Sequence, residues 1–217
     1  MSIAPSLWAI PIANSVSDFS GTQGFLNWYY GYYTSPFTPA TFTEYNHYDP
    51  TPDFTATSGE WVQDSATFYS NSAYWATLFD QGGHPESTTT TAPRTAVNEW
   101  SVRRWVSTID GDITITGHIA KQNPSGGDGT TEYILDNGAT VLTQFIAGTD
   151  GAGVDYTVTI DNVHIGDDID FAISPNSNDF FDGTFFTAQI DVTPVPEPDT
   201  LLLLSAGLFA LQRKRRS

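Results

Sequence analysis

From residue 100 to residue 192 the chain repeats short runs in which apolar and polar residues alternate, and this period of two limits what it can fold into. The clearest run, residues 112–120, would place its isoleucines on one face. Residues 154–160 and 184–192 alternate in the same way. Successive side chains of a β-strand point to opposite faces, so this pattern predicts strands buried on one side. We see no helix of ordinary length before the end of the chain.

Turn residues separate these runs at regular intervals. The Asp-Asn-Gly sequence at residues 136–138 divides the runs 131–135 and 140–146, and Asn-Gly favours a hairpin because both residues tolerate positive φ. Residues 100–106 and 169–173 add two more runs. Short strands with Gly- and Asn-rich turns indicate a sandwich or a barrel. We predict an all-β protein, an antiparallel β-sandwich of jelly-roll type.

The predicted sandwich domain spans residues 16–192. Its half before Trp100 is less regular, but the many aromatic residues there argue against disorder, and we expect first strands plus long loops over one face. Residues 1–15 contain no Lys or Arg, so they lack the basic start of a signal peptide. We favour the remnant of a signal peptide whose true start lies upstream; an N-terminal arm or first strand is the alternative.

The charge balance excludes one large class of function. The chain has 8 basic and 25 acidic residues, a formal net charge of −17. Four of the bases and two of the acids lie after residue 194, which leaves 4 bases and 23 acids, a net charge of −19, in the body. Nucleic-acid binding depends on Lys and Arg that neutralise phosphates, so we expect no DNA or RNA partner.

The end of the chain has three zones in a fixed order. Residues 193–200 form a proline-rich linker, and residues 201–217 combine an apolar run, predicted to be a short hydrophobic helix, with a basic stop. An apolar segment that ends in clustered positive charge holds a chain in a membrane with that end in the cytoplasm. The apolar run is shorter than the about 20 residues of a full span, so any anchor is weak or transient. The basic stop consists of Arg213, Lys214, Arg215 and Arg216.

This tail resembles a PEP-CTERM sorting signal, which occurs on exported proteins of many Gram-negative bacteria. The motif residues are Val195, Pro196, Glu197 and Pro198, followed by the apolar run and the basic stop. The resemblance implies recognition by a membrane enzyme called exosortase, membrane attachment only before processing, and a final place at the cell surface or outside the cell. The alternative is a C-terminal core or amphipathic helix with a disordered basic end.

The body resembles a second kind of protein. Residues 102–190 are similar to carbohydrate-binding β-sandwich modules of bacterial extracellular proteins, and the similarity implies fold and context without assigning a ligand residue. The marks are Arg103-Arg104-Trp105, Gly126-Gly127-Asp128-Gly129, Asp136-Asn137-Gly138, Gly166-Asp167 with Ile169-Asp170-Phe171, and the segment 178–184.

Aromatic residues are the candidates for ligand contact. Exposed flat rings stack on the apolar faces of sugars, and Tyr adds a hydroxyl group. In a strand over residues 28–33, every second ring would share a face, and other rings could extend that platform; the alternative is that most of these rings fill the core. The candidate ligand-binding residues are Trp28, Tyr30, Tyr32, Trp61 and Trp75.

Carboxylates offer weaker signals. Asp110, Asp112 and Asp128 lie in Gly-rich loops that could hold a structural calcium ion, but none matches an EF-hand, and solvated loop acids are the favoured interpretation. We expect no required cofactor. A pair of carboxylates for glycan hydrolysis could exist among the 23 acids, although sequence spacing does not locate one.

The adjacent Arg103 and Arg104 provide half of the body's positive charge. In a strand one points inward and would need a carboxylate partner, such as Asp110 or a later acid, while the other could bind an acidic sugar. We favour a structural ion pair.

These observations predict an exported, non-catalytic surface or matrix protein that binds polysaccharide or is structural. The alternatives are a glycan-active enzyme and a coat protein without a specific ligand.

Overall fold

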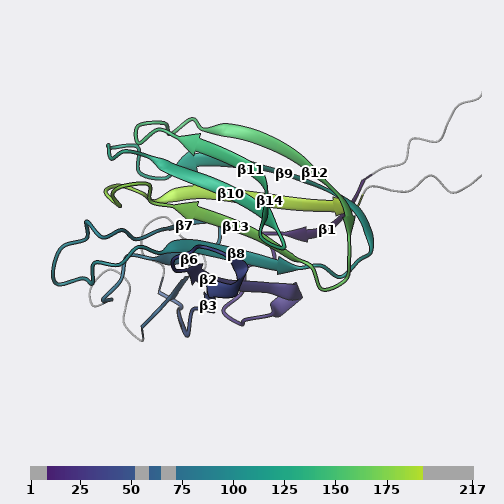
Figure 1. The fold of residues 1–217 in the computed structure, drawn as a ribbon, viewed down its shortest axis with the longest axis horizontal. Coiled ribbons are helices and arrows are strands. Elements are labelled where there is room, and N and C mark those ends of the chain that lie inside the picture. The colour runs from purple at the N-terminus through teal and green to yellow at the C-terminus, as the bar shows by residue number, and fades with distance from the viewer. Residues whose placement is uncertain (1–8, 52–58, 65–71, 193–217) are drawn as a thin grey trace, which may run out of the picture.

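The computed structural model describes residues 9–51, 59–64 and 72–192, and it contains two antiparallel sheets in two layers (Figure 1). The first sheet runs in the order β12 (Val154–Val163), β9 (Gly111–Lys121), β14 (Thr184–Val192), β7 (Gly82–His84), β6 (Thr77–Phe79), β5 (Glu60–Val62) and β4 (His47–Asp49). Strand β1 (Ile10–Asn14) also pairs with β14.

The second sheet runs in the order β11 (Ala139–Ile146), β10 (Thr130–Asp136), β13 (Asp168–Ser174), β8 (Trp100–Val106), β2 (Trp28–Tyr33) and β3 (Phe42–Glu44). Two short 3₁₀ turns, Phe25–Asn27 and Pro39–Thr41, flank β2. Among the described residues, no helix has the length and apolar character needed to cross a membrane. The expected all-β fold with two antiparallel sheets is confirmed, while the jelly-roll type stays a prediction.

The core lies between the two sheets. Ile113, Ile115 and Ile119 of β9 are fully buried, as the period of two predicts. They meet residues of the other sheet, and the rings of Phe171 and Phe186 make an edge-to-face contact across the layers at 5.7 Å. Such pairs add to the apolar area that burial removes from water.

The strands expected between residues 100 and 192 are all present, and each begins and ends within two or three residues of the predicted bounds. The β10–β11 hairpin turns at Asn137 and Gly138, whose φ angles are 47° and 86°. These positive values are the reason for the Asn-Gly sequence, because most other side chains would be strained there.

The domain begins earlier than expected. Residues 10–14 form β1 and pair antiparallel with residues 189–192 of β14. Ser15 continues this contact, since its backbone N–H donates to the Ala188 carbonyl at 2.8 Å and its hydroxyl accepts from the Ala188 N–H. The boundary at residue 16 is therefore wrong, and part of the expected arm is a strand of the sheet. The linker and tail, residues 193–217, lie outside the described residues.

A loop covers the outer face of the second sheet, as expected for the first half of the chain. Phe37 stacks on Trp100 at 4.6 Å, and Trp100 stacks on Tyr133 at 4.8 Å with an interplanar angle of 5°. With Phe42 they pack over a small second core of Tyr33, Val102, Leu135 and Ala172. The centre of the outer face of the second sheet is thus covered by side chains.

Strand β8 points Arg103 inward and Arg104 outward. The Arg103 guanidinium donates to the carbonyl oxygens of Ser15, at 3.0 Å, and Phe79, at 2.5 Å, so the inward arginine bonds to backbone carbonyls instead of the expected carboxylate. Arg104 on the outer face makes the ion pair, at 2.7 Å to Asp170 and 2.8 Å to Asp168. A structural ion pair is present, but the outward arginine makes it and the inward one does not.

We predict that Arg104→Gln lowers the free energy of unfolding by about 3–5 kcal/mol, because Asp170 is fully buried and would lose its charged partner. Urea denaturation followed by circular dichroism measures the change. Arg104→Lys keeps the charge without the two-pronged geometry, so its loss should be smaller. A loss below about 1 kcal/mol for Arg104→Gln, as for an exposed pair, would contradict this interpretation.

Candidate ligand site at one end of the sandwich

The structure places most of the predicted ligand-binding aromatics out of reach. Trp28 and Tyr30 are completely buried, and Trp61 is 5% exposed. Trp61 stacks on Tyr30 between the sheets at 5.6 Å. The exposed platform is therefore wrong for these three residues, because Trp28 and Tyr30 lie on the core-facing side of β2 and Trp61 of β5 packs against Tyr30. Tyr32 is half-buried against Tyr45.

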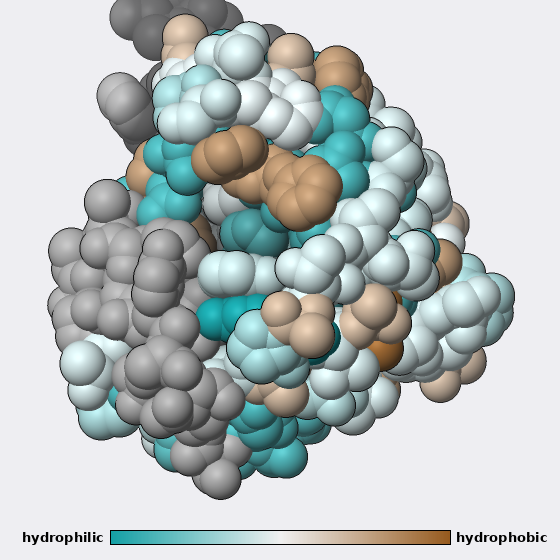
Figure 2. All heavy atoms as spheres, turned by 90° about the vertical axis from the view of Figure 1, so that its left-hand side faces the viewer, coloured by the Kyte–Doolittle hydropathy of each residue, from teal (hydrophilic) through white to brown (hydrophobic). Residues whose placement is uncertain are grey.

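Trp75 has a different position, because it lines a cavity of about 310 Å³ at one end of the sandwich. We call this the end cavity. Figure 2 looks onto this end and shows a hollow with hydrophobic side chains on its rim. The lining comes from segments far apart in the sequence: Trp75, His84, Thr90, Thr91, Gln122, Asn123, Asp179, Phe180, Phe181 and Gly183.

Two adjacent phenylalanines add to the apolar part of the lining beside Trp75. Phe180 and Phe181 are 52% and 47% exposed, and Phe181 has a φ angle of 63°. Few side chains adopt this backbone conformation, and strain of this kind gathers at functional sites. Gly127 permits the close approach of this turn, since a Cβ atom there would lie 2.1 Å from the Phe180 carbonyl oxygen.

Asp179, directly before the two phenylalanines, holds the loop of residues 87–90 in place. Its carboxylate accepts hydrogen bonds from the Ser87 backbone N–H at 3.3 Å, from the Thr89 hydroxyl at 3.2 Å and from the Thr90 hydroxyl. These contacts tie the segment after β7 to the segment before β14. Asp179 is therefore a positioning group with its acceptor sites in use.

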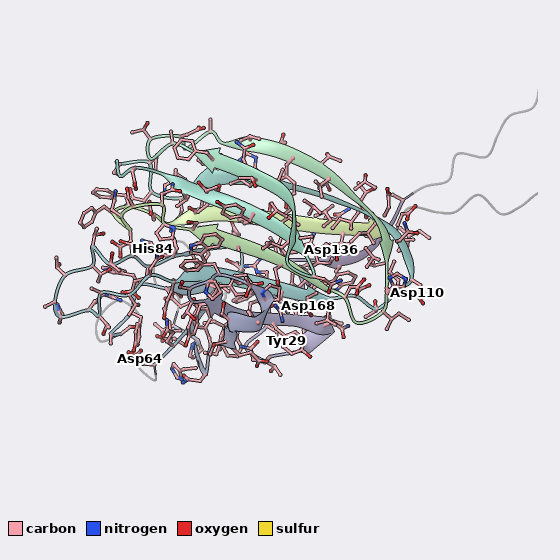
Figure 3. The ribbon with its side chains drawn as sticks, viewed as in Figure 1. Tyr29, Asp64, His84, Asp110, Asp136 and Asp168 are labelled. Atoms are coloured by element: carbon pink, nitrogen blue, oxygen red, sulfur yellow. The ribbon has the colours of Figure 1, made fainter. Side chains whose placement is uncertain are left out.

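His84 is uncharged at neutral pH. Burial lowers the pKa of its imidazole to about 4. Its Nδ1 lies 2.6 Å from the Pro85 carbonyl oxygen, and since a carbonyl only accepts, Nδ1 carries the proton. Figure 3 shows His84 at the same end of the molecule as the cavity.

Cations near the cavity are engaged in the protein. The Arg94 guanidinium lies 3.6 Å from the centre of the Trp75 ring and donates to the Tyr74 carbonyl oxygen. Lys121 and Asp182 form a completely buried ion pair at 2.9 Å. Burial also raises the pKa of the nearby Glu132 to about 8, so this carboxyl is largely neutral at pH 7.

Two buried glutamates, Glu86 and Glu99, flank the loop of residues 87–98, which contributes Thr90 and Thr91 to the cavity lining. Glu86 and Glu99 exchange two backbone hydrogen bonds of 2.9 Å and so join the two ends of residues 87–98. Burial, and after it the Glu99 carboxyl, raises the pKa of Glu86 to about 8. Burial raises the pKa of Glu99 to about 7.

The three suggested calcium ligands do not come together. Asp110 and Asp112 accept backbone hydrogen bonds from Ile165 and Asn162, at the end of the sandwich opposite the end cavity (Figure 3). Asp128 accepts from Ser177 near the cavity end. Within residues 9–51, 59–64 and 72–192, no group of three His, Asp or Glu side chains has the arrangement of a metal site.

Several residues of the lining were not predicted from the sequence, among them Phe180, Phe181, Gln122 and Asn123. A usable signal was present in the segment 178–184, where two large apolar residues stand in a turn between Asn and Asp residues. Apolar residues in a turn between strands have no core face to join, which predicts exposure. The amides of Gln122 and Asn123 gave no comparable signal.

Comparison with known families identifies the tail. A family model described as a PEP-CTERM protein-sorting motif matches residues 194–216. The chain therefore carries the sorting motif of an exported protein, which an exosortase directs to the cell surface or the extracellular space. No curated protein matches the chain.

We predict that thermal stability falls between pH 5 and pH 9, because ionisation of Glu86 costs folding free energy. Its folded-state pKa of about 8 lies above the ordinary 4.5, so the contribution of the protonated carboxyl is complete below pH 4.5 and is lost as the pH rises toward 8. Glu86→Gln should reduce the fall in Tm, measured by circular dichroism, and the exposed Glu44→Gln should not. Equal slopes in all three proteins would contradict the assignment.

Proposed function

We propose that this is a non-catalytic polysaccharide-binding protein of the cell surface or extracellular matrix, and that the end cavity holds the sugar. One observation carries the proposal: two exposed phenylalanine rings stand on the rim of a cavity whose other lining groups are mostly uncharged hydrogen-bonding side chains. Pyranose rings have apolar faces for the aromatic rings and hydroxyl groups for the amides.

The arrangement supports binding more than hydrolysis. Glycoside hydrolysis uses two carboxyl groups on either side of the bond to be cleaved. Asp179 is the one carboxylate among the described residues of the lining, and its oxygens accept three hydrogen bonds from the neighbouring loop. A group held in this way positions the wall of a binding site.

The direction of β14 places the cavity far from Val192, after which the tail follows. The chain enters β14 at Thr184 beside the cavity and leaves it at Val192, and nine residues of strand cover about 30 Å. Held in a membrane through its tail before exosortase processing, the protein would present the cavity at the opposite end from the point of attachment. This geometry suits capture of a polymer outside the cell.

We predict that Phe180→Ala weakens binding to a retained polysaccharide about tenfold, through loss of a stacking contact of about 1–1.5 kcal/mol. Affinity electrophoresis of the full chain through gels that contain different glycans measures the change. Phe145→Ala is the matched control, because Phe145 is also a half-exposed phenylalanine but lies on the edge strand β11. Equal effects of the two substitutions, or no retardation by any glycan, would contradict the proposal.

A further inference from the structure

The positions of the positive charges restrict which polysaccharide the end cavity can take. Residues 1–194 hold 4 basic and 23 acidic residues. All four bases lie in described segments of the chain: Arg94, Arg103, Arg104 and Lys121.

Two of these cations lie inside the protein. Arg103 is 2% exposed and donates to the carbonyl oxygens of Ser15 and Phe79. Lys121 is fully buried and pairs with Asp182. Neither can reach a polymer outside.

The other two are held by neighbours. Arg104 pairs with Asp168 and Asp170 on the outer face of the second sheet, away from the cavity. Arg94 contacts the lining, because its guanidinium stacks on Trp75, and it bonds to the Tyr74 carbonyl. The body therefore has a large net negative charge, and each of its four cationic side chains contacts other groups of the protein.

Among the described residues of its lining, the cavity offers no counter-charge to an anion. The rings, hydroxyls and amides are uncharged, His84 is neutral, and Asp179 is an acid. A carboxylate, sulfate or phosphate brought into this space would lose water without gaining a cationic partner. It would also approach against the negative field of the body.

We propose that the end cavity binds an uncharged sugar unit of a neutral polysaccharide and rejects uronate-containing, sulfated or phosphorylated polymers. This inference rests on the proposed function and specifies its ligand class. The rings of Phe180 and Phe181 would stack on the apolar face of the sugar, while Asn123 and Thr91 contact its hydroxyls. Negatively charged polymers would be rejected because their binding is unfavourable. Among the described residues, neither the cavity nor its surroundings supplies a free cation to pair with their charge.

The test compares neutral glycans with charged derivatives of the same backbone. The full chain is measured by affinity electrophoresis and calorimetry against a panel of neutral glucans and mannans and against their carboxymethylated and sulfated forms. At 0.15 M salt we expect at least one neutral polymer to bind at least about tenfold more tightly than its charged forms. Raising the salt to about 1 M, where the Debye length is about 3 Å, should narrow the difference without reversing it.

The variants separate this inference from the proposed function. Phe180→Ala should weaken binding of the neutral polymer, and Phe145→Ala should not. Equal or tighter binding of a charged derivative, lost in Arg94→Gln, would overturn the neutral ligand class and leave glycan binding at this end intact. Tighter binding of a cationic amino-sugar polymer that depends on Phe180 would also overturn it. Absence of binding to every polymer, neutral or charged, would overturn the proposed function and this inference together.

Discussion

The alternation of side chains along β8 is the constraint on which most of the structure depends. It sends Arg103 into the space between the sheets and Arg104 to the outer face, one residue apart. Inside, the guanidinium joins the second sheet to the turn after β1 and to β6 of the first sheet. On the outer face, the Arg104 guanidinium pairs with two carboxylates of β13 beneath the covering loop. A buried cation without such partners would destabilise the fold, so the surrounding strands must supply them.

Sequence patterns predicted the later strands well because each has a clear apolar face. They were less informative where both faces are aromatic. In Trp28-Tyr29-Tyr30 the period of two identifies which rings share a face, but it does not say which face meets the core. For the same reason the pattern did not say which of Arg103 and Arg104 faces inward, and the outward one makes the ion pair. Strands β3 to β7 have three residues each, too few to show any period.

The end cavity could not be predicted from spacing, since it forms where three separate parts of the chain meet. Residues 75–91, 122–123 and 179–183 come together because β7, β9 and β14 are neighbours in one sheet and reach the same end of it. Their hydrogen bonds, centred on Asp179, fix the loop that carries Thr90. Only the paired phenylalanines of residues 178–184 left a trace in the sequence. The suggested calcium ligands do not converge, because Asp110 and Asp112 lie at the start of β9 and Asp128 follows its other end.

The chain thus has a tail that directs export and a body that lies outside the cell after export. The body ends at Val192, at the end of the sandwich away from the cavity. The most direct test of this division is the intact mass of the protein recovered from the surface and extracellular fractions of the cells that make it. The account predicts a mature protein that has lost the chain beyond the Val195-Pro196-Glu197-Pro198 motif while keeping the folded body. A full-length protein confined to the cytoplasm would contradict it.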